Sequence, residues 1–166
     1  SWSYHWELSM NPNITCKIVK ENPNKNWNWY ALSENPNITL EIVKENRDKP
    51  WDWYRLSMNP NITWDTVASF PNNPWHWCGL SENPNITCKI VKENPDIPWD
   101  YWYGLSYNPN ITWEFVQTNL DKNWNWYGLS MNSNITCKIV KENPNKKWNW
   151  YGLSSNPNIT LNFIED

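Results

Sequence analysis

The sequence of 166 residues has little of what catalysis requires. It contains only 4 Gly and 2 His, and it shows neither a Gly-rich phosphate loop nor a nucleophile motif. His5 and His76 have no Cys or Asp set nearby at the spacing of metal ligands. Carboxylates are scattered along the chain and form no unique pair. We therefore expect a protein that is not an enzyme and that has no metal site and no cofactor.

Long apolar runs and an excess of basic residues are also missing. No stretch reaches the roughly 18 apolar residues of a membrane span. The first six residues, Ser-Trp-Ser-Tyr-His-Trp, lack the charged and apolar blocks of a signal peptide. The net charge of −3 and the pI near 5.4 leave no basic stripe for nucleic acid. We expect no membrane segment, and nucleic acid is not the expected partner.

Tryptophan and proline are abundant, with 16 and 13 residues. The mean hydropathy is −0.85, because Asn and charged residues are frequent. Disordered chains are poor in aromatic residues, whereas each Trp can bury roughly 150–250 Å² of surface. The composition therefore predicts a folded chain with a Trp-rich core.

The sequence Asn-Pro-Asn-Ile-Thr recurs along the chain, once with Ser133 in place of Pro. Its copies begin at Asn11, Asn35, Asn59, Asn83, Asn108, Asn132 and Asn156. Successive starts are 24 residues apart, except for one step of 25 between Asn83 and Asn108. A fixed period of this size is typical of solenoids. We predict a single repeat solenoid over 11–166, preceded by a partial repeat or cap over 1–10.

Each repeat divides into two similar halves that open with Asn-Pro or a related turn, such as 11–21 and 22–34. Thr15 can cap a helix, and Ile14 and Val19 have the spacing of a hydrophobic staple. In the second halves, Pro50 and its equivalents suit the first turn of a helix. Helices of about two turns need stacking for stability. The prediction is an all-α, right-handed solenoid of seven repeats, each with two short helices, α plus α or 3-10.

The second halves carry the motif Trp-x-Trp-Tyr, as in Trp51-Asp52-Trp53-Tyr54. Residues two apart on a helix point in nearly opposite directions, so we expect Trp51 and Tyr54 on one side and Trp53 on the other. A helix that is apolar on both sides is buried on both sides. The motif predicts packing between neighbouring repeats, and the alternative is an exposed Trp row that stacks on sugars or bases. The one 25-residue step comes from an extra residue in 99–103.

Two polar positions vary between repeats and are the candidate partner-facing residues, because both are expected to face solvent. The first is Lys17, Glu41, Asp65, Lys89, Glu114 and Lys138. It alternates in sign and could form weak Lys–Glu ladders between repeats. The second is Asn28, Asp52, His76, Asp100, Asn125 and Asn149.

Cys16, Cys88 and Cys137 share one apolar position of the repeat. Stacked helices lie about 8–10 Å apart, which separates Cys16 and Cys88 by roughly 25–30 Å, whereas a disulfide needs Cα atoms within about 7 Å. Free thiols and a reducing compartment are expected. Asn-Ile-Thr is also a glycosylation triplet, although a turn and a cap explain it equally.

The period and the two turns resemble the leucine-rich variant repeat. The resemblance rests on Asn59-Pro60-Asn61-Ile62, the segment 64–67, a second turn near Phe70-Pro71 and Leu80-Ser81. It implies a right-handed solenoid of alternating α- and 3-10 helices, although that family has small aliphatic residues and Arg where this chain has Trp-x-Trp-Tyr. The motifs Val-Lys-Glu-Asn-Pro and Trp-x-Trp-Tyr-Gly-Leu-Ser resemble those of tandem-repeat proteins from giant DNA viruses that infect amoebae. This resemblance implies that the protein is located in the host cytoplasm or in the virion.

A regular array favours a binding or structural role over a unique reaction centre. We expect a scaffold for protein–protein interaction that uses an elongated face. The alternative is a structural protein that assembles end to end into a fibre or sheath, since the sequence begins and ends within a repeat. Binding of single-stranded nucleic acid or glycan is the third possibility.

Overall fold

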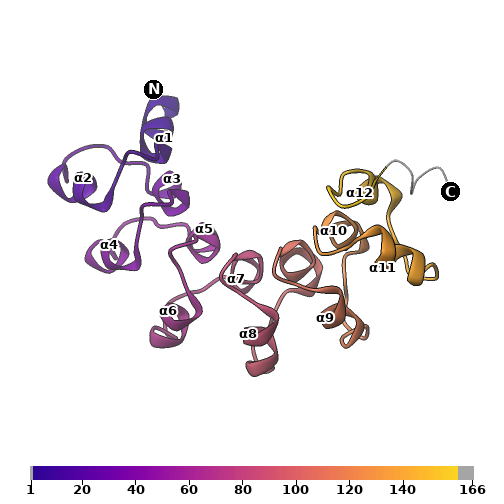
Figure 1. Ribbon diagram of the computed structural model, residues 1–166. Helices are drawn as coiled ribbons and strands as arrows, with labels where there is room; N and C mark the ends of the chain where they lie inside the picture. Colours follow the sequence, from indigo (N-terminus) through magenta and orange to yellow (C-terminus); the bar gives the residue numbers. More distant parts are fainter. Residues whose placement is uncertain (1, 161–166) are drawn as a thin grey trace. The chain divides into compact units, whose positions relative to one another are not determined.

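The computed structural model describes residues 2–160, with side chains from His5 onward, and this range contains twelve α-helices and one π-helix but no strand (Figure 1). The first halves of the repeats form α2 Cys16–Glu21, α4 Leu40–Glu45, α6 Trp64–Ser69, α8 Cys88–Glu93, α9 Trp113–Gln117 and α11 Cys137–Glu142. The second halves form α3 Trp29–Glu34, α5 Trp53–Met58, α7 Trp77–Glu82, η1 Tyr101–Leu105, α10 Trp126–Met131 and α12 Trp150–Ser154. Helix α1, Trp2–Met10, precedes them.

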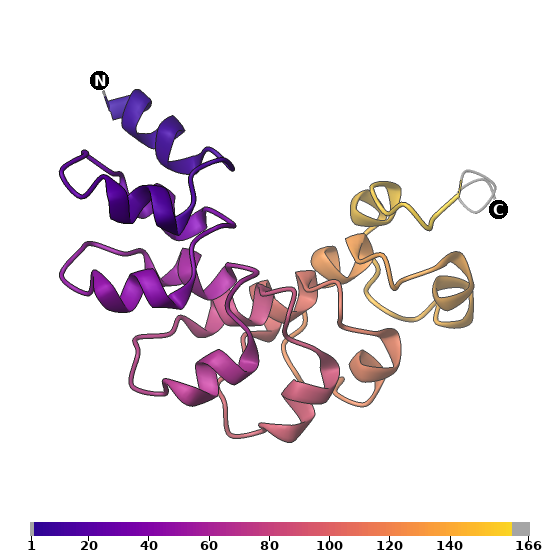
Figure 2. The same cartoon turned by 60° about the vertical axis from the view of Figure 1, so that its left-hand side comes forward.

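The chain divides into two compact units, 1–85 and 86–166. In the first unit, α1, α3, α5 and α7 pack one against the next, and α2, α4 and α6 form a second row (Figure 1). Figure 2 shows these first-half helices, from indigo to magenta, one above the other. In the second unit α10 packs against α12. The predicted all-α repeat solenoid is confirmed, while the single domain over 11–166 stays a prediction. The first-half helix of the seventh repeat would fall on 161–166, outside the described residues.

The first-half helices begin as the sequence predicts. The Thr15 hydroxyl accepts a hydrogen bond from the Ile18 N–H at 3.4 Å, which satisfies one of the free donors of the first turn. Ile14 and Val19, the predicted staple, are both buried. The same threonine cap recurs at Thr63, and the later repeats repeat it.

The second-half helices begin two residues later than predicted. Helix α3 begins at Trp29, and Asn28 is its N-cap, with Oδ1 accepting from the Ala31 N–H at 2.9 Å. Trp27 therefore lies before the helix, where its indole Nε1–H donates to the Asn22 carbonyl at 3.0 Å. Pro50 likewise lies outside the helix, two residues before a cap. The two Trp of the motif are not on opposite sides of one helix, and that part of the prediction is wrong.

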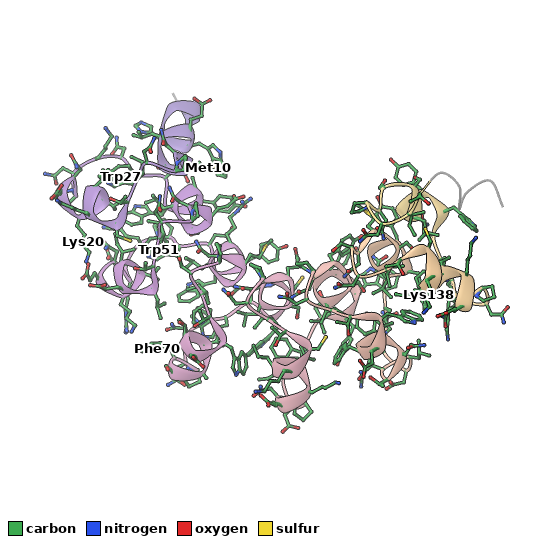
Figure 3. The ribbon with its side chains drawn as sticks, in the orientation of Figure 1. Met10, Lys20, Trp27, Trp51, Phe70 and Lys138 are labelled. Atoms are coloured by element: carbon green, nitrogen blue, oxygen red, sulfur yellow. The ribbon has the colours of Figure 1, made fainter. Side chains whose placement is uncertain are left out.

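Tryptophan side chains nevertheless pack between repeats, as predicted. The second Trp of one motif meets the first Trp of the next edge to face, with centroids 5.0 Å apart for Trp29–Trp51 and 5.3 Å for Trp53–Trp75. Trp126–Trp148 repeats this contact at 5.3 Å in the second unit. Figure 3 shows Trp27 and Trp51 between the two rows of helices. Such pairs add about 0.5–1.5 kcal/mol beyond the area that they bury.

A second connection between repeats uses the first asparagine of Asn-Pro-Asn. Asn59 Nδ2 donates to the carbonyl of Asn35 at 3.0 Å, at the start of the preceding repeat, and to that of Ser33 at 3.2 Å, just before that start. Its Oδ1 accepts from the Asn61 N–H at 3.0 Å. We call this series the asparagine ladder, and its members are Asn35, Asn59, Asn83, Asn108, Asn132 and Asn156. All six are buried, so every rung satisfies backbone carbonyls in the interior.

The second asparagine of the motif adds another set of bonds. Asn61 Nδ2 donates to the carbonyls of Pro36 and, at 3.2 Å, of Ile38. Equivalent bonds to the preceding repeat are made by Asn37, Asn85, Asn110, Asn134 and Asn158. Nδ2 is also the atom that a glycan would modify. At these positions the atom connects two repeats.

Candidate functional site

The first variable position is exposed in all six repeats that contain it, as predicted. Its lysines pair within their own helices, as Lys17 does with Glu21 at 3.8 Å. The contact between repeats is made by a neighbouring residue, because Lys20 Nζ lies 3.4 Å from Glu41 and 2.9 Å from Glu45 of the next repeat (Figure 3). Its hydrogen bond to Glu45 raises the pKa of Lys20. The predicted Lys–Glu ladder between residues of the first variable position does not form. Ion pairs within one helix, and pairs from Lys20 to the next repeat, take its place.

The second variable position has a structural role that the sequence pattern did not predict. All six of its residues are N-caps: Asn28, Asp52, His76, Asp100, Asn125 and Asn149. Even His76 acts in this way, with Nδ1 accepting from the Gly79 N–H at 3.3 Å. Only His76 and Asn149 are exposed, and the others are half-buried. The prediction that this position faces solvent is wrong for those four, because capping turns the side chain toward the backbone.

The tyrosine that follows the second Trp of the motif is exposed in four repeats. We call Tyr30 and Tyr54 of the first unit, and Tyr103, Tyr127 and Tyr151 of the second, the tyrosine row; Tyr127 is half-buried and the other four are exposed. Their exposed fractions include 45% for Tyr30, 61% for Tyr103 and 72% for Tyr151. The sequence predicts Tyr54 beside Trp51 in a buried layer. This prediction is wrong because the helix starts later, which turns the Tyr54 position outward.

Members of the row contact charged and aromatic neighbours. The Arg55 guanidinium lies 4.3 Å from the Tyr30 ring and forms an ion pair with Glu34. The Tyr54 hydroxyl donates to Glu82 at 2.9 Å. Partial burial and this bond raise the pKa of Tyr54 well above its ordinary value. In the second unit Tyr127 and Tyr151 stack, with centroids 6.1 Å apart and an interplanar angle of 20°.

The regular pattern changes at η1, where the 25-residue step lies. The Leu105 N–H donates to the Asp100 carbonyl, five residues back, at 2.7 Å, whereas the equivalent Leu32 N–H reaches back four residues. Tyr101 keeps the edge contact to the next repeat, with its centroid 5.1 Å from Trp124. Trp102 is therefore the additional residue, and it is 40% exposed. Single π-turns inside helices often mark functional sites.

Trp102 lies at a pocket of about 600 Å³ in the second unit. We call it the π-helix pocket. Its lining includes Trp102, Lys122, Asn123, Asn145, Lys146 and Lys147. Tyr127 of the tyrosine row also lines it. No carboxylate is among its lining residues. The sequence signal for this site was the single irregular step in the repeat.

The lysines of the π-helix pocket differ in their surroundings. Lys122 Nζ lies 3.4 Å from Asp121 and 5.8 Å from the Tyr101 ring. Burial raises the pKa of Tyr101, and Lys122 opposes that shift. Lys146 and Lys147 form no ion pair with any residue that the structure describes. The pocket therefore combines aromatic surface with an excess of positive charge.

Metal and thiol chemistry have no cluster to support them in residues 2–160. No group of three His, Cys, Asp or Glu side chains in that range could hold a metal ion. The four cysteines are free and half-buried, and Cys16 Sγ–H donates to the Asn37 carbonyl at 3.1 Å. None of the helices in the described part of the chain has the length and apolar character of a membrane span.

Comparison with known proteins adds no relative. No protein-family model, no curated protein and no solved structure matches the chain. The resemblances to the leucine-rich variant repeat and to giant-virus repeat proteins therefore stay predictions.

Proposed function

We propose that the chain is a non-enzymatic repeat scaffold that binds proteins through the tyrosine row. The observation that supports this proposal is the exposure of large aromatic side chains at one repeated position. Most Trp, Asn, Thr and Ile side chains of the repeat are engaged in packing, ladders and caps, although Trp150 is exposed. The tyrosines instead expose much of their surface, and Tyr and Arg are enriched where proteins bind one another.

The tyrosine position is not needed by the fold itself. In the repeat that begins at Asn59 it is occupied by Cys78, and helix α7 forms there as elsewhere. A residue that packing does not require, yet that is large and aromatic in the neighbouring repeats, is better explained by a binding role. In the first unit Arg55 adds a guanidinium to this surface, stacked on Tyr30.

Selection from a displayed peptide library, followed by fluorescence anisotropy on the selected peptides, tests the proposal. Changing Tyr30 or Tyr151 to Ala should weaken binding about tenfold or more, as is usual for an interface anchor. Glu21→Ala and Glu142→Ala, on exposed first-half helices, are the matched controls and should leave affinity unchanged. Circular dichroism verifies that every variant is folded.

Two results would contradict the proposal. One is the absence of any peptide that binds above background, and the other is binding that the tyrosine changes do not affect. Light scattering over a concentration series tests the alternative, in which the protein is structural and assembles end to end. A mass that rises above 20.0 kDa with concentration, and that the tyrosine changes suppress, would favour end-to-end assembly.

A further inference from the structure

We propose that the π-helix pocket binds an extended, acidic peptide segment of a protein partner. This inference rests on the proposed scaffold function and adds the chemistry of the partner. It is confined to the second unit, where all of the lining residues lie. Three features of the pocket support it: an inserted aromatic residue, a set of lysines at a repeated position, and side-chain amides beside them.

Trp102 provides exposed apolar surface beside the pocket, and its ring contacts the adjacent Tyr103, with centroids 6.4 Å apart. Tyr101 makes the ring contact to Trp124 that the second Trp of the motif makes elsewhere. The insertion of Trp102 changes the hydrogen-bond pattern of η1, a less favourable geometry than an α-helix, and leaves 40% of the side chain exposed. An exposed Trp beside a pocket is the residue type that most often anchors a bound partner.

The lysines favour an extended ligand over a compact one. Lys122 and Lys146 occupy the same place in successive repeats, 14 residues after Asn108 and Asn132 (122 − 108 and 146 − 132). Lys147 follows directly. Cations repeated along an array match acidic side chains repeated along a strand, where residues i and i+2 face the same way about 7 Å apart. Within residues 5–160, Asp121 is the one acid paired with these lysines.

The remaining lining suits a peptide backbone. Asn123 and Asn145 are exposed, and their amides can donate and accept hydrogen bonds. A volume of about 600 Å³ lies within the range of roughly 300–1,000 Å³ for ligand pockets. Single-stranded nucleic acid also pairs aromatic side chains with cations, but the net charge of −3 opposes a long polyanion more than a short acidic segment.

The test uses a short fluorescent peptide in which Glu alternates with Leu, together with its counterpart in which Gln replaces Glu. At low salt the acidic peptide should bind the full chain about tenfold or more tightly than the Gln peptide. The combined variant Lys122→Gln, Lys146→Gln, Lys147→Gln should lose about tenfold of that affinity. Lys25→Gln, at the same repeat position in the first unit, is the matched control and should bind as the unchanged chain does.

Trp102 is tested in two ways. Its deletion restores the 24-residue step, so that Asp100-Tyr101-Tyr103 matches Asn28-Trp29-Tyr30 and the α-helical pattern can return. This variant should fold at least as stably as the unchanged chain while its affinity for the acidic peptide falls about tenfold or more. Trp102→Ala, at the exposed side chain, gives the same readout if the deletion disturbs folding.

Several outcomes would overturn the inference. Equal affinity for the Glu and Gln peptides, or an affinity unaffected by the triple lysine variant, removes the acidic partner. Tighter binding of labelled oligothymidine than of the acidic peptide would assign the pocket to nucleic acid. If library peptides bind through the tyrosine row but the acidic peptide does not bind, only this inference fails. If neither binds, the proposed function fails as well.

Discussion

Replacing Asn83 by Ala should be among the most destabilising single changes at a polar residue. Asn83 Nδ2 lies 2.7 Å from the carbonyl of Ser57, 3.0 Å from that of Asn59 and 3.1 Å from that of Ile62. Its Oδ1 accepts from the Asn85 N–H at 2.8 Å. The side chain is fully buried, with 0% exposed. Alanine would leave these backbone groups without the partner that they have in the interior.

The expected cost follows from the number of bonds. An amide nitrogen carries two hydrogens, so two of the three donor contacts can be full hydrogen bonds at once. With the accepted bond this makes three, and at about 1 kcal/mol each the loss is about 3 kcal/mol. That is a large part of the roughly 5–15 kcal/mol by which small domains are stable.

Chemical denaturation, followed by Trp fluorescence and circular dichroism, measures the change in the free energy of unfolding. The matched control is Asn11→Ala, because Asn11 has the same place in the repeat, is exposed, and accepts the same local bond from Asn13 at 2.8 Å. We expect a loss below about 1 kcal/mol there. Asn83→Asp keeps the acceptor but loses the donors, and should cost at least as much as Ala. If the Asn83 and Asn11 variants were equally stable, the ladder would contribute no net stability.

The other predictions concern the first unit. Gly79→Ala places a Cβ 2.6 Å from the Tyr54 carbonyl oxygen, so thermal unfolding should show a loss of about 1–3 kcal/mol from overpacking; a more stable variant would refute the close approach. Asp52→Ala removes the cap bond to the Arg55 N–H at 3.1 Å and should cost about 1 kcal/mol, whereas Asp52→Asn should retain most of it. The raised pKa of Tyr54 beside Glu82 means that the folded state holds this proton more tightly than the unfolded state does. The stability that this proton adds to the folded state is complete below pH 10 and is lost as the pH rises above it. In an alkaline absorbance titration, Tyr54 should ionise as a late step that Tyr54→Phe abolishes.

The sequence was sufficient to predict those parts of the fold that depend on residues close together in the chain. Thr15 caps its helix through a bond to a residue three positions on, and Ile14 and Val19 lie on either side of it. The start of α3 was misplaced because Trp27 and Trp29 fit a helical pattern equally well. The start of α3 is set by the hydrogen bond from the Trp27 indole to the Asn22 carbonyl, which closes a turn before the helix. The polar residue between the two Trp, a good N-cap, was the signal for the later start.

The connections between repeats were harder to predict. A turn explains the first asparagine of each repeat, and only the neighbouring repeat shows that its amide is buried. One signal was present: Asn132 is retained in the repeat where Ser133 replaces Pro. The extra residue before Leu105 could be located from the spacing. That Trp102 rather than Tyr101 is the exposed residue depends on the ring contact with Trp124, which no local pattern specifies.

The asparagine ladder has a direction, because each amide donates to carbonyls of the repeat before it. Every repeat thus carries its own donors and presents acceptors to whatever follows it. A gene segment of 24 codons, copied in frame from any starting point, would encode a unit whose bonds on both sides are already specified. Lengthening by whole periods is therefore neutral for the fold, whereas a one-codon gain must be absorbed locally, as it is at η1.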